Sequence, residues 1–274
     1  MNALARALFQ PTEAELRARA DADTEIVARD DLLLSARPPL EYPWSSQVCW
    51  VRWDAARIDA GIDEVLGSFR ARRQAFVWLV TEGSTPESLR DRLEERGFIR
   101  ELEGRMLLAR LPLPTFHVNA DVRVEEVTDR ARMEDAIRVD HPNGRPAHIA
   151  LLLKDRMRRL GKDWHAAVAY IRDKPVGTAR WMIHRALRAV EFTGAETLSQ
   201  YRRQGVYSTL VAYRAAYGAR EDCAFAGIIA DSGTSAPILM KRGFEDHGRA
   251  TYFLWPVSHF TRAAASLAQR TDAP

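Results

Sequence analysis

The stretch Thr197-Leu-Ser-Gln-Tyr-Arg-Arg-Gln-Gly-Val-Tyr-Ser-Thr-Leu210 decides how this chain is interpreted. It predicts the end of a strand, a turn rich in hydrogen-bond donors, and a helix whose apolar pattern begins at Val206. The first turn of a helix has unpaired backbone N–H groups and the positive end of the dipole. Arg202 and Arg203 add two guanidiniums, and Gly205 permits close approach of the backbone to a ligand. The stretch therefore predicts a phosphate or pyrophosphate site, the alternative being a glycine turn with solvated arginines.

The segment Arg202-x-x-Gly205-x-Tyr207 follows Thr197-Leu198 and precedes Ser235-Ala-Pro-Ile-Leu-Met-Lys-Arg-Gly-Phe244. This arrangement resembles the acyl-CoA-binding half of the GNAT superfamily of N-acyltransferases. The family pattern is Arg or Gln, two residues, Gly, one residue, then Gly or Ala, so Tyr207 departs from it. The resemblance covers residues 121–256 well and the first hundred residues faintly. It implies acetyl-CoA as the co-substrate and an unidentified amine as the acceptor.

The resemblance also implies which residues bind the cofactor. They are Thr197, Leu198, Ser199, Arg202, Arg203, Gln204, Gly205, Val206, Tyr207, Ser208 and Ser235. No metal is predicted, because Cys49 and Cys223 lie far apart and show no metal-ligand spacing. Both cysteines lie in apolar runs, which favours buried free thiols over a disulfide.

Composition is typical of a globular protein, with 46% hydrophobic and 28% charged residues in a chain of 274, long enough for two domains. The net charge of +3 fits an anionic cofactor. The arginine clusters at 70–73 and 156–159 are interspersed with acidic residues, and no nucleic-acid-binding motif is present, so nucleic acid is not a predicted partner. No run reaches the length of a membrane span, which makes a cytoplasmic protein the default expectation and excludes a membrane partner.

The two halves of the chain repeat one pattern. Residues 75–86 parallel residues 224–235, each an apolar strand-like run that ends in a polar turn. Each run precedes a helical pattern that ends in Arg96-Gly97-Phe98 or Arg242-Gly243-Phe244, the sequence of a helix stop leading into a strand. A tandem pair of related domains is the favoured interpretation, and a chance echo of common helix–glycine–strand sequences is the alternative.

The proline-containing residues 111–120 predict the boundary between a domain of residues 1–115 and one of residues 116–274. The second half has the GNAT order of strand, two helices, three strands, helix, strand, helix and strand, with Thr128 as the cap of its first helix. The first half shows fewer of these parts and no cofactor turn. We therefore expect an α/β (α+β) fold of two GNAT-like domains, each with a mixed, mostly antiparallel sheet flanked by helices. The first domain is interpreted as a degenerate copy with a structural or substrate-shaping role.

Acylation of an amine by a thioester requires a proton acceptor, stabilisation of the oxyanion, and protonation or tolerance of the departing thiolate. The resemblance implies that residues 190–198 form the strand that faces the thioester, with a bulge at Gly194. Glu191 stands at about the distance before the motif where the family places its base, and Glu196 falls nearer the thioester. Both are predicted as catalytic candidates. The alternative for either is a salt bridge to one of three arginines on adjacent strands: Arg180, Arg185 or Arg188.

The family often places a tyrosine, which protonates the departing thiol, where this chain has Leu239. The candidates for a replacement acid are Tyr207, Tyr252 and Ser235, and we take Tyr252 as the catalytic one. The missing tyrosine leaves open a second function, that of a non-catalytic acyl-CoA-binding sensor or scaffold. Two histidines, His141 and His148, flank the break between the first two helices of the second half and are candidates to bind the acceptor amine. A monomer and a homodimer both remain open.

Overall fold

The structure is a computed structural model that describes residues 3–37, 43–72, 74–114, 118–142, 149–161 and 163–256. The chain forms two compact units. Unit 1 comprises Met1–Leu8 and Arg105–His247, and unit 2 comprises Phe9–Gly104 and Gly248–Pro274. Two strands, β5 (Ile99–Arg110) and β11 (Glu245–Trp255), are divided between the units, as is the first helix, α1 (Ala3–Phe9).

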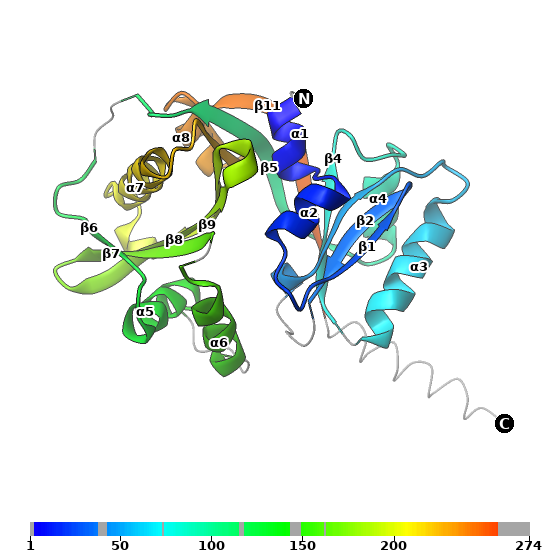
Figure 1. Cartoon of the computed structure of the whole chain (residues 1–274), viewed down its shortest axis with the longest axis horizontal. Helices are drawn as coiled ribbons and strands as arrows, with labels where there is room; N and C mark the ends of the chain where they lie inside the picture. The colour runs from blue at the N-terminus through cyan, green and yellow to red at the C-terminus, as the bar shows by residue number, and fades with distance from the viewer. Residues whose placement is uncertain are drawn as a thin grey trace. The chain divides into compact units, whose positions relative to one another are not determined.

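Unit 1 is an α/β unit built on a mostly antiparallel sheet (Figure 1). Its further elements are β6 (Arg123–Glu126), α5 (Arg130–Asp140), α6 (Ile149–Arg159), β7 (Trp164–Ile171), β8 (Lys174–His184), β9 (Ala189–Thr197), α7 (Val206–Arg220), β10 (Phe225–Asp231) and α8 (Ser235–Met240). The strand order is β5-β10-β9-β8-β7-β6. Neighbours from β9 to β6 are antiparallel, and β9 and β10 are parallel.

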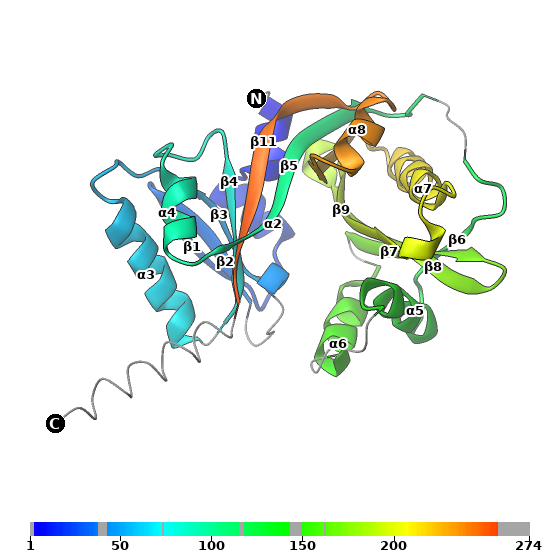
Figure 2. The same cartoon turned by 180° about the vertical axis from the view of Figure 1, so that it is seen from behind.

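Helices cover both faces of the unit 1 sheet, α5 and α6 on one face and α7 on the other (Figures 1 and 2). Apolar side chains explain this arrangement. Met133 and Ile137 of α5 belong to one buried cluster with Val168 of β7. Val211 of α7 belongs to a different cluster with Trp181 of β8. Because alternate residues of a strand point to opposite faces, each face of the sheet has its own core.

Unit 2 repeats this architecture. Its further elements are α2 (Glu13–Arg19), β1 (Glu25–Arg29), β2 (Leu32–Ala36), β3 (Gln47–Val51), α3 (Ile58–Ala71), β4 (Phe76–Thr81) and α4 (Leu89–Glu95), and its strand order is β1-β2-β3-β4-β11-β5. Ile62 and Phe69 of α3 pack with Leu34 of β2 on one face. Leu16 of α2 packs with Leu33 of β2 on the other.

The tandem repeat predicted from the sequence is confirmed in its local geometry. Gly97 and Gly243 each have φ 88°, the left-handed conformation of a glycine helix stop. The N–H of Phe98 donates to the carbonyl of Leu93 at 3.0 Å, and the N–H of Phe244 donates to the carbonyl of Leu239 at 3.2 Å. The same hydrogen bond therefore ends α4 and α8. It makes Leu93 the structural counterpart of Leu239.

The compact units differ from the predicted boundary between residues 115 and 116. The sequence assigns the strand at 251–255 to the domain of residues 116–274, but β11 pairs antiparallel with β4, from Ala250 opposite Thr81 to Trp255 opposite Phe76. Unit 2 therefore takes the last strand of the described chain. The division passes through β5 and β11, between Gly104 and Arg105 and between His247 and Gly248.

Two further sequence expectations need correction. The helix that begins after residue 128 is capped by Asp129, whose carboxylate accepts from the N–H of Arg132 at 2.9 Å, and not by Thr128. The first half also contains more of the repeat than its sequence indicates. From α1 to β5 it follows the order of the second half from α5 to β11, and no counterpart of β6 occurs among its described residues.

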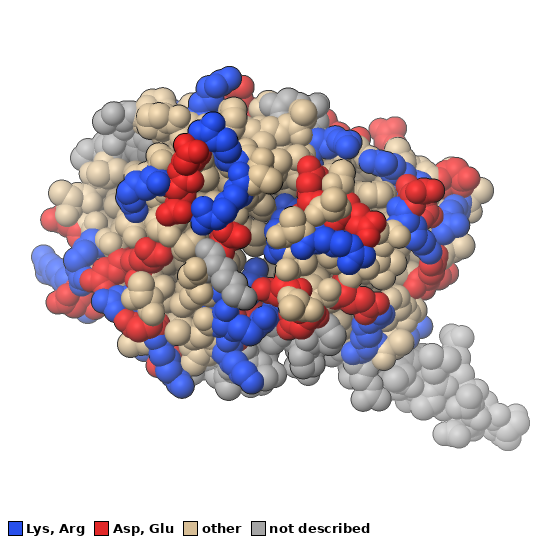
Figure 3. Space-filling model, viewed as in Figure 1, with Lys and Arg blue, Asp and Glu red and all other residues tan. Residues whose placement is uncertain are grey.

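Charged side chains of both signs lie among one another on the face shown in Figure 3. Many are paired, for example Arg123 with Asp173 and Arg185 with Asp163. Such pairs in water are worth little individually. Within the described residues, no helix is long and apolar enough to cross a membrane.

Candidate active site

The turn before α7 has the backbone geometry of a site that a ligand can approach closely. Gly205 is the N-cap of α7 and has φ 79°, a conformation that favours glycine. A Cβ at this position would lie 3.0 Å from the Cβ of Asn119. Because Gly205 has no side chain, the N-cap leaves the first N–H groups of α7 uncapped. The positive end of a 15-residue helix is therefore presented at this turn.

Arginines surround the same turn. Arg202 and Arg203 are exposed, and Arg202 Nη2 donates to Glu196 Oε1 at 3.4 Å. Arg242, which follows α8, donates from Nη2 to Ser208 Oγ at 3.3 Å, so a third guanidinium lies at the first turn of α7. Together with the helix dipole, this arrangement suits a ligand with several negative charges.

Asn119, which lies shortly before β6, holds the turn in place. Asn119 donates from Nδ2 to the carbonyl of Gln204 at 2.8 Å and from its backbone N–H to Thr209 Oγ1 at 3.3 Å. The Thr209 hydroxyl in turn donates to the carbonyl of Gly205 at 3.0 Å. These bonds fix the turn before a ligand arrives, which reduces the entropy lost on binding.

The strands next to this turn, β9 and β10, separate part-way along their length. Their parallel register runs from Ala189 opposite Phe225 to Glu191 opposite Gly227 and ends there. The remainder of β9, residues 192–197, is therefore not paired with the remainder of β10. Main-chain groups along these two facing edges are available to a ligand, since no ladder joins them.

The other edge of β9 has a β-bulge, as the sequence predicts. Arg180 of β8 pairs with Gly194, whereas the next residue, Trp181, pairs with Phe192. Thr193 is therefore the extra residue, next to the predicted position. A bulge shifts the alternation of side chains by one residue and bends the strand.

Because of the bulge, both candidate glutamates lie on the face covered by α5 and α6. Glu191 pairs with Met182, which packs against the core of that face. Beyond the bulge, a Cβ at Gly194 would lie 2.6 Å from Arg180 Nη2, and the Arg180 side chain bonds to α5. Glu196 lies two residues further along and so shares this face. Without the extra residue, two positions five apart would face opposite sides.

Glu191 forms a hydrogen bond with a buried histidine. The His184 Nε2–H donates to Glu191 Oε2 at 2.7 Å. The His184 side chain is 5% exposed and the Glu191 carboxylate 21% exposed, so the carboxylate is the member of the pair that water or a substrate can reach. Both lie at the level where β9 and β10 separate, since Glu191 is the last paired residue of β9. The pair can accept and hold a proton there.

A second group of charges lies on the same face. The Asp140 carboxylate, at the end of α5, accepts from Arg180 and, at 2.7 Å, from Arg156 Nη1. Burial raises the pKa of Asp140, but the combined effect of Arg180 and Arg156 is larger, so the net shift of this pKa is downward. Asp140 is therefore ionised at neutral pH, and the group has a net positive charge beside the bulge.

The structure separates the other catalytic candidates. Glu196 is 44% exposed and bonds to Arg202, so it belongs to the turn. Tyr252 pairs with Leu79 of β4, and its ring lies 5.0 Å from that of Trp44. It therefore belongs to unit 2 and is not among the residues that unit 1 brings together, because the strand that contains it joins β4. This corrects the expectation that Tyr252 lies in the domain of the cofactor turn.

The remaining residues that the sequence singled out lie in different parts of the structure. Leu239 is fully buried, like its counterpart Leu93. His141 is the C-cap of α5, which ends there as predicted, whereas His148 lies outside the described residues. The arginines proposed as partners of the glutamates bond to other carboxylates: Arg180 to Asp140, Arg185 to Asp163 and Arg188 to Asp222. Both cysteines are free and buried, as predicted. Within the described residues, no cluster of metal-ligating side chains occurs.

The sequence did not reveal His184 as the partner of Glu191, nor Asp140 or Asn119 as parts of the site. Each depends on a contact between segments distant in the chain. For His184, the register of β8 against β9 was needed, because it places His184 and Glu191 diagonally across the two strands. The sequence did contain one indication of His184: the residue stands at the end of an apolar strand pattern.

No family model matches the chain, and no curated protein does. Solved structures are similar to it over most of its length. A GCN5-related N-acetyltransferase from Kribbella flavida has a TM-score of 0.64 and 21% identity, over 93% of this chain and 96% of that one. A GCN5-related N-acetyltransferase from Sphaerobacter thermophilus has a TM-score of 0.55 and 14% identity, over 83% and 81%. A tandem GNAT protein from the clavulanic acid biosynthesis pathway has a TM-score of 0.51 and 12% identity, over 87% and 85%. The chain thus has the GNAT fold in its tandem form.

Proposed function

We propose that this protein is an N-acyltransferase that transfers an acyl group, by default acetyl, from acyl-CoA to a primary amine of a small molecule or peptide. The observation that carries the proposal is a combination found in unit 1. An uncapped helix N-terminus at Gly205 lies next to β9, which separates from β10 beyond Glu191. The first feature suits a pyrophosphate, and the second suits an extended chain that hydrogen-bonds to a strand edge.

Buried polar atoms beside the turn support this assignment. The Thr197 hydroxyl, at the end of β9, and the Tyr207 hydroxyl, in the first turn of α7, are buried and have no hydrogen-bond partner. Buried polar groups are normally paired, so unpaired ones indicate that a partner is missing. The pantetheine arm of CoA has amide groups that can serve as partners, and the residues present therefore fit the cofactor.

In this proposal each part of the site has one role. Arg202, Arg203 and the first N–H groups of α7 bind the pyrophosphate, and the free edge of β9 orients the thioester. Glu191 takes a proton from the acceptor amine, directly or through a water, and His184 holds the carboxylate in position. The acceptor approaches from the face covered by α5 and α6, because Glu191 lies on that face.

Binding is tested by calorimetric titration of acetyl-CoA into the intact chain and two variants. Arg203→Ala removes a charge at the turn and is expected to weaken binding about tenfold or more, the value of one hydrogen bond to a charged group. Arg57→Ala is the matched control, since Arg57 is the N-cap of α3 in unit 2, and it is expected to leave the affinity unchanged. Equal losses in both variants, or no binding to the intact chain, would contradict the proposal.

Turnover separates the enzyme from a non-catalytic acyl-CoA sensor. Release of CoA from acetyl-CoA is measured with putrescine, L-lysine, kanamycin and a lysine-containing peptide as acceptors. Release that depends on one of these amines supports an enzyme. Micromolar binding without release to any of them supports the sensor, which the buried leucine at position 239 favours.

A further inference from the structure

Two polar side chains of α7 are buried without complete hydrogen bonding. Arg214 is fully buried, and its Nη2 has no partner. Its other donors reach only main-chain carbonyls, from Nε to Leu210 at 3.2 Å and from Nη1 to Arg180 at 3.4 Å. The Tyr207 hydroxyl, two helical turns earlier, makes no hydrogen bond of ordinary geometry, although Arg214 and the Ser235 hydroxyl lie close enough to act on its pKa. A buried guanidinium is normally paired with a carboxylate, so this arrangement is unfavourable for the unliganded protein.

Both side chains lie where β9 and β10 separate. The Cζ of Arg214 lies 4.2 Å from the ring centroid of Phe192, the first residue of β9 beyond the paired segment. Tyr207 packs against the core that contains Phe192 and Leu239, between α7 and α8. A ligand that occupies the opening between the two strands therefore has the phenol and the guanidinium on its α7 side.

The charges around the phenol favour its ionised form more than a purely apolar site would. Burial has the largest effect and raises the pKa of Tyr207, while Arg214 and the Ser235 hydroxyl both act to lower it. Burial lowers the pKa of Arg214 to about 10, so this side chain is still charged at neutral pH. The neighbouring charged groups are thus Arg214 on α7 itself and Arg180 on β8, while α8 contributes the neutral Ser235.

We infer that Tyr207 is the general acid that protonates the departing CoA thiolate, and that Arg214 is a positioning residue that stabilises the phenolate left behind. This inference rests on the proposed function. It also accounts for two departures from the family pattern together. The phenol that is missing at Leu239 is supplied by Tyr207, which replaces a small residue in the turn and whose ring packs against the cluster that contains Leu239.

The proposed step is balanced in protons and electrons. The amine nitrogen forms a bond to the acyl carbon, and the carbon–sulfur bond breaks with its electron pair passing to sulfur. The proton of the amine passes to Glu191. The Tyr207 O–H proton passes to the sulfur and yields free CoA thiol, and the phenolate then regains a proton from water. No oxidant, reductant or metal is required.

Tyr207→Phe is the decisive variant, because it keeps the ring and removes only the unpaired hydroxyl. We expect kcat to fall about 10²-fold or more, the usual contribution of a general acid, with the Kd of acetyl-CoA unchanged within twofold. We also expect the variant to be as resistant to urea as the parent or more so, because an unsatisfied buried hydroxyl contributes nothing to folding. Tyr213→Phe is the matched control on the same helix, and it should leave kcat unchanged.

The reaction is followed in a single turnover with acetyl-CoA and the amine, among the four above, that gives the fastest release of CoA. Loss of rate with intact binding and undiminished stability supports the inference. An unchanged single-turnover rate overturns it, as does a loss explained by weaker binding or lower stability. If the parent protein does not bind acetyl-CoA or acylates none of the amines, the proposed function fails, and the inference fails with it. Those controls on the parent distinguish the two failures.

Discussion

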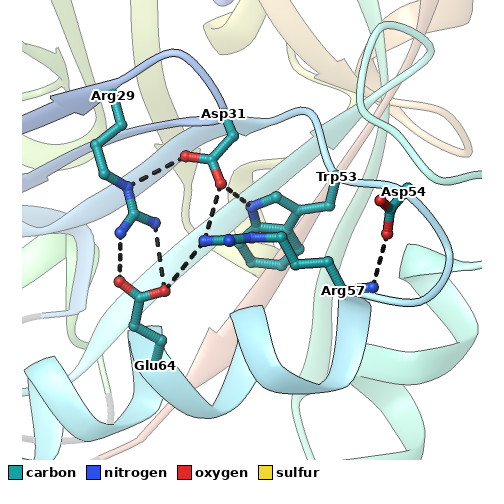
Figure 4. Close-up of polar contacts among 6 residues, drawn as sticks. All are labelled: Arg29, Asp31, Trp53, Asp54, Arg57 and Glu64. Atoms are coloured by element: carbon teal, nitrogen blue, oxygen red, sulfur yellow. Dashed lines mark hydrogen bonds and ion pairs between the residues drawn. The ribbon is translucent and has the colours of Figure 1, made fainter.

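The N-terminus of α7 in unit 1 and that of α3 in unit 2 are equivalent positions in the repeat, and they are built in opposite ways. At α7, Gly205 leaves the helix end uncapped and arginines surround it. At α3, the N-cap is Arg57, whose backbone N–H donates to Asp54 Oδ1 at 2.8 Å. Asp31 and Glu64 lie beside it and bind Arg57 and Arg29 (Figure 4). Neither N-cap side chain caps its helix, so the contrast lies in charge: an anion at α3 would meet carboxylates where an anion at α7 would meet guanidiniums.

The space at the start of α3 is also filled. The indole of Trp53 donates from Nε1 to Asp31 at 3.1 Å and packs so closely on α3 that a Cβ at Gly61 would lie 2.7 Å from its ring (Figure 4). Trp53 is 4% exposed and packs edge-on to Trp78. Trp53 and Trp78 are therefore core residues of unit 2.

The two parallel strands of unit 2, β3 and β4, leave no opening like that between β9 and β10 in unit 1. In unit 2, Gln47 pairs with Val77 and Val48 with Trp78, and the chain after β4 then returns to β3. There the N–H of Thr85 donates to Val51 and its carbonyl accepts from Trp53. The opening that follows the paired segment in unit 1 is therefore closed in unit 2 by main-chain hydrogen bonds.

The parallel ladders of the two units also end differently. The ladder of unit 1 ends at Glu191 opposite Gly227, and that of unit 2 ends at Val48 opposite Trp78. Val48 and Trp78 are fully buried in the core on the α3 side of their sheet, whereas Glu191 lies on the face covered by α5 and α6. One fold supports either a site or a packed core, depending on a few residues at the strand separation.

The largest expected effect concerns the carboxylate that unit 2 lacks. Glu191→Gln keeps the size of the side chain and removes its basicity, so kcat is expected to fall about 10²–10⁴-fold with little change in the Kd of acetyl-CoA. Glu196→Gln is the control, and its kcat should change less than tenfold, because Glu196 bonds to Arg202 in the turn. Steady-state kinetics with the best acceptor amine give both values. Comparable losses in the two variants would remove Glu191 from its role.

The second comparison is between two carboxylates that each bind two arginines, one buried and one exposed. Asp140→Asn leaves Arg156 and Arg180 as buried charges without a carboxylate, so we expect the free energy of unfolding to fall by about 3–5 kcal/mol. Glu64→Gln acts on a carboxylate that is 49% exposed, and the expected loss is about 0.2–1 kcal/mol. Urea unfolding measures both. Equal losses of stability in the two variants would contradict the view that only the arginines bound to Asp140 are buried charges.

The stability lost in Asp140→Asn is expected to depend on pH. The pKa of Asp140 is lowered in the folded protein, so its contribution is fully present above its ordinary pKa and is lost as pH falls through the lowered value. The stability difference between the parent and Asp140→Asn should therefore be constant from pH 7 to about pH 5 and shrink below about pH 4. A difference that grows towards acid pH would be inconsistent with an ionised Asp140.

Smaller effects than that of Asp140→Asn are expected at the two glycines near the helix starts. Gly205→Ala places a side chain at φ 79° and should cost about 1–2 kcal/mol of stability. Gly61→Ala crowds the ring of Trp53 and should cost about 1–3 kcal/mol. Only Gly205→Ala is expected to weaken the binding of acetyl-CoA as well. Loss of affinity in Gly61→Ala would show that unit 2 contributes to the cofactor site.

Local sequence signals were enough to predict the turn, the helix stops at Gly97 and Gly243, and the elements of unit 1. They failed for β2 and β3, because helices cover both faces of these strands. Leu33 and Cys49 pack on one face and Leu34 and Val48 on the other, so the strands read as continuous apolar runs without alternation.

The pairing of β11 with β4 was beyond sequence reasoning for a different reason. Each copy of the repeat ends in a similar strand, and the sequence does not specify which copy the last strand joins. The Glu191–His184 contact depends on the register of β8 against β9, which places Met182 opposite Glu191 and His184 opposite Ala189. Contacts of this kind are set by register, and a single sequence contains little information about register.

Hydrogen–deuterium exchange with and without acetyl-CoA tests the contrast between the two units most directly. We predict that acetyl-CoA protects residues 192–210 of unit 1, at the free edge of β9 and the start of α7, with one molecule bound per chain. The equivalent segment of unit 2, residues 49–62, should exchange at the same rate in both conditions. Protection of that segment, or a stoichiometry of two, would show that the second helix N-terminus also binds the cofactor and would contradict the account.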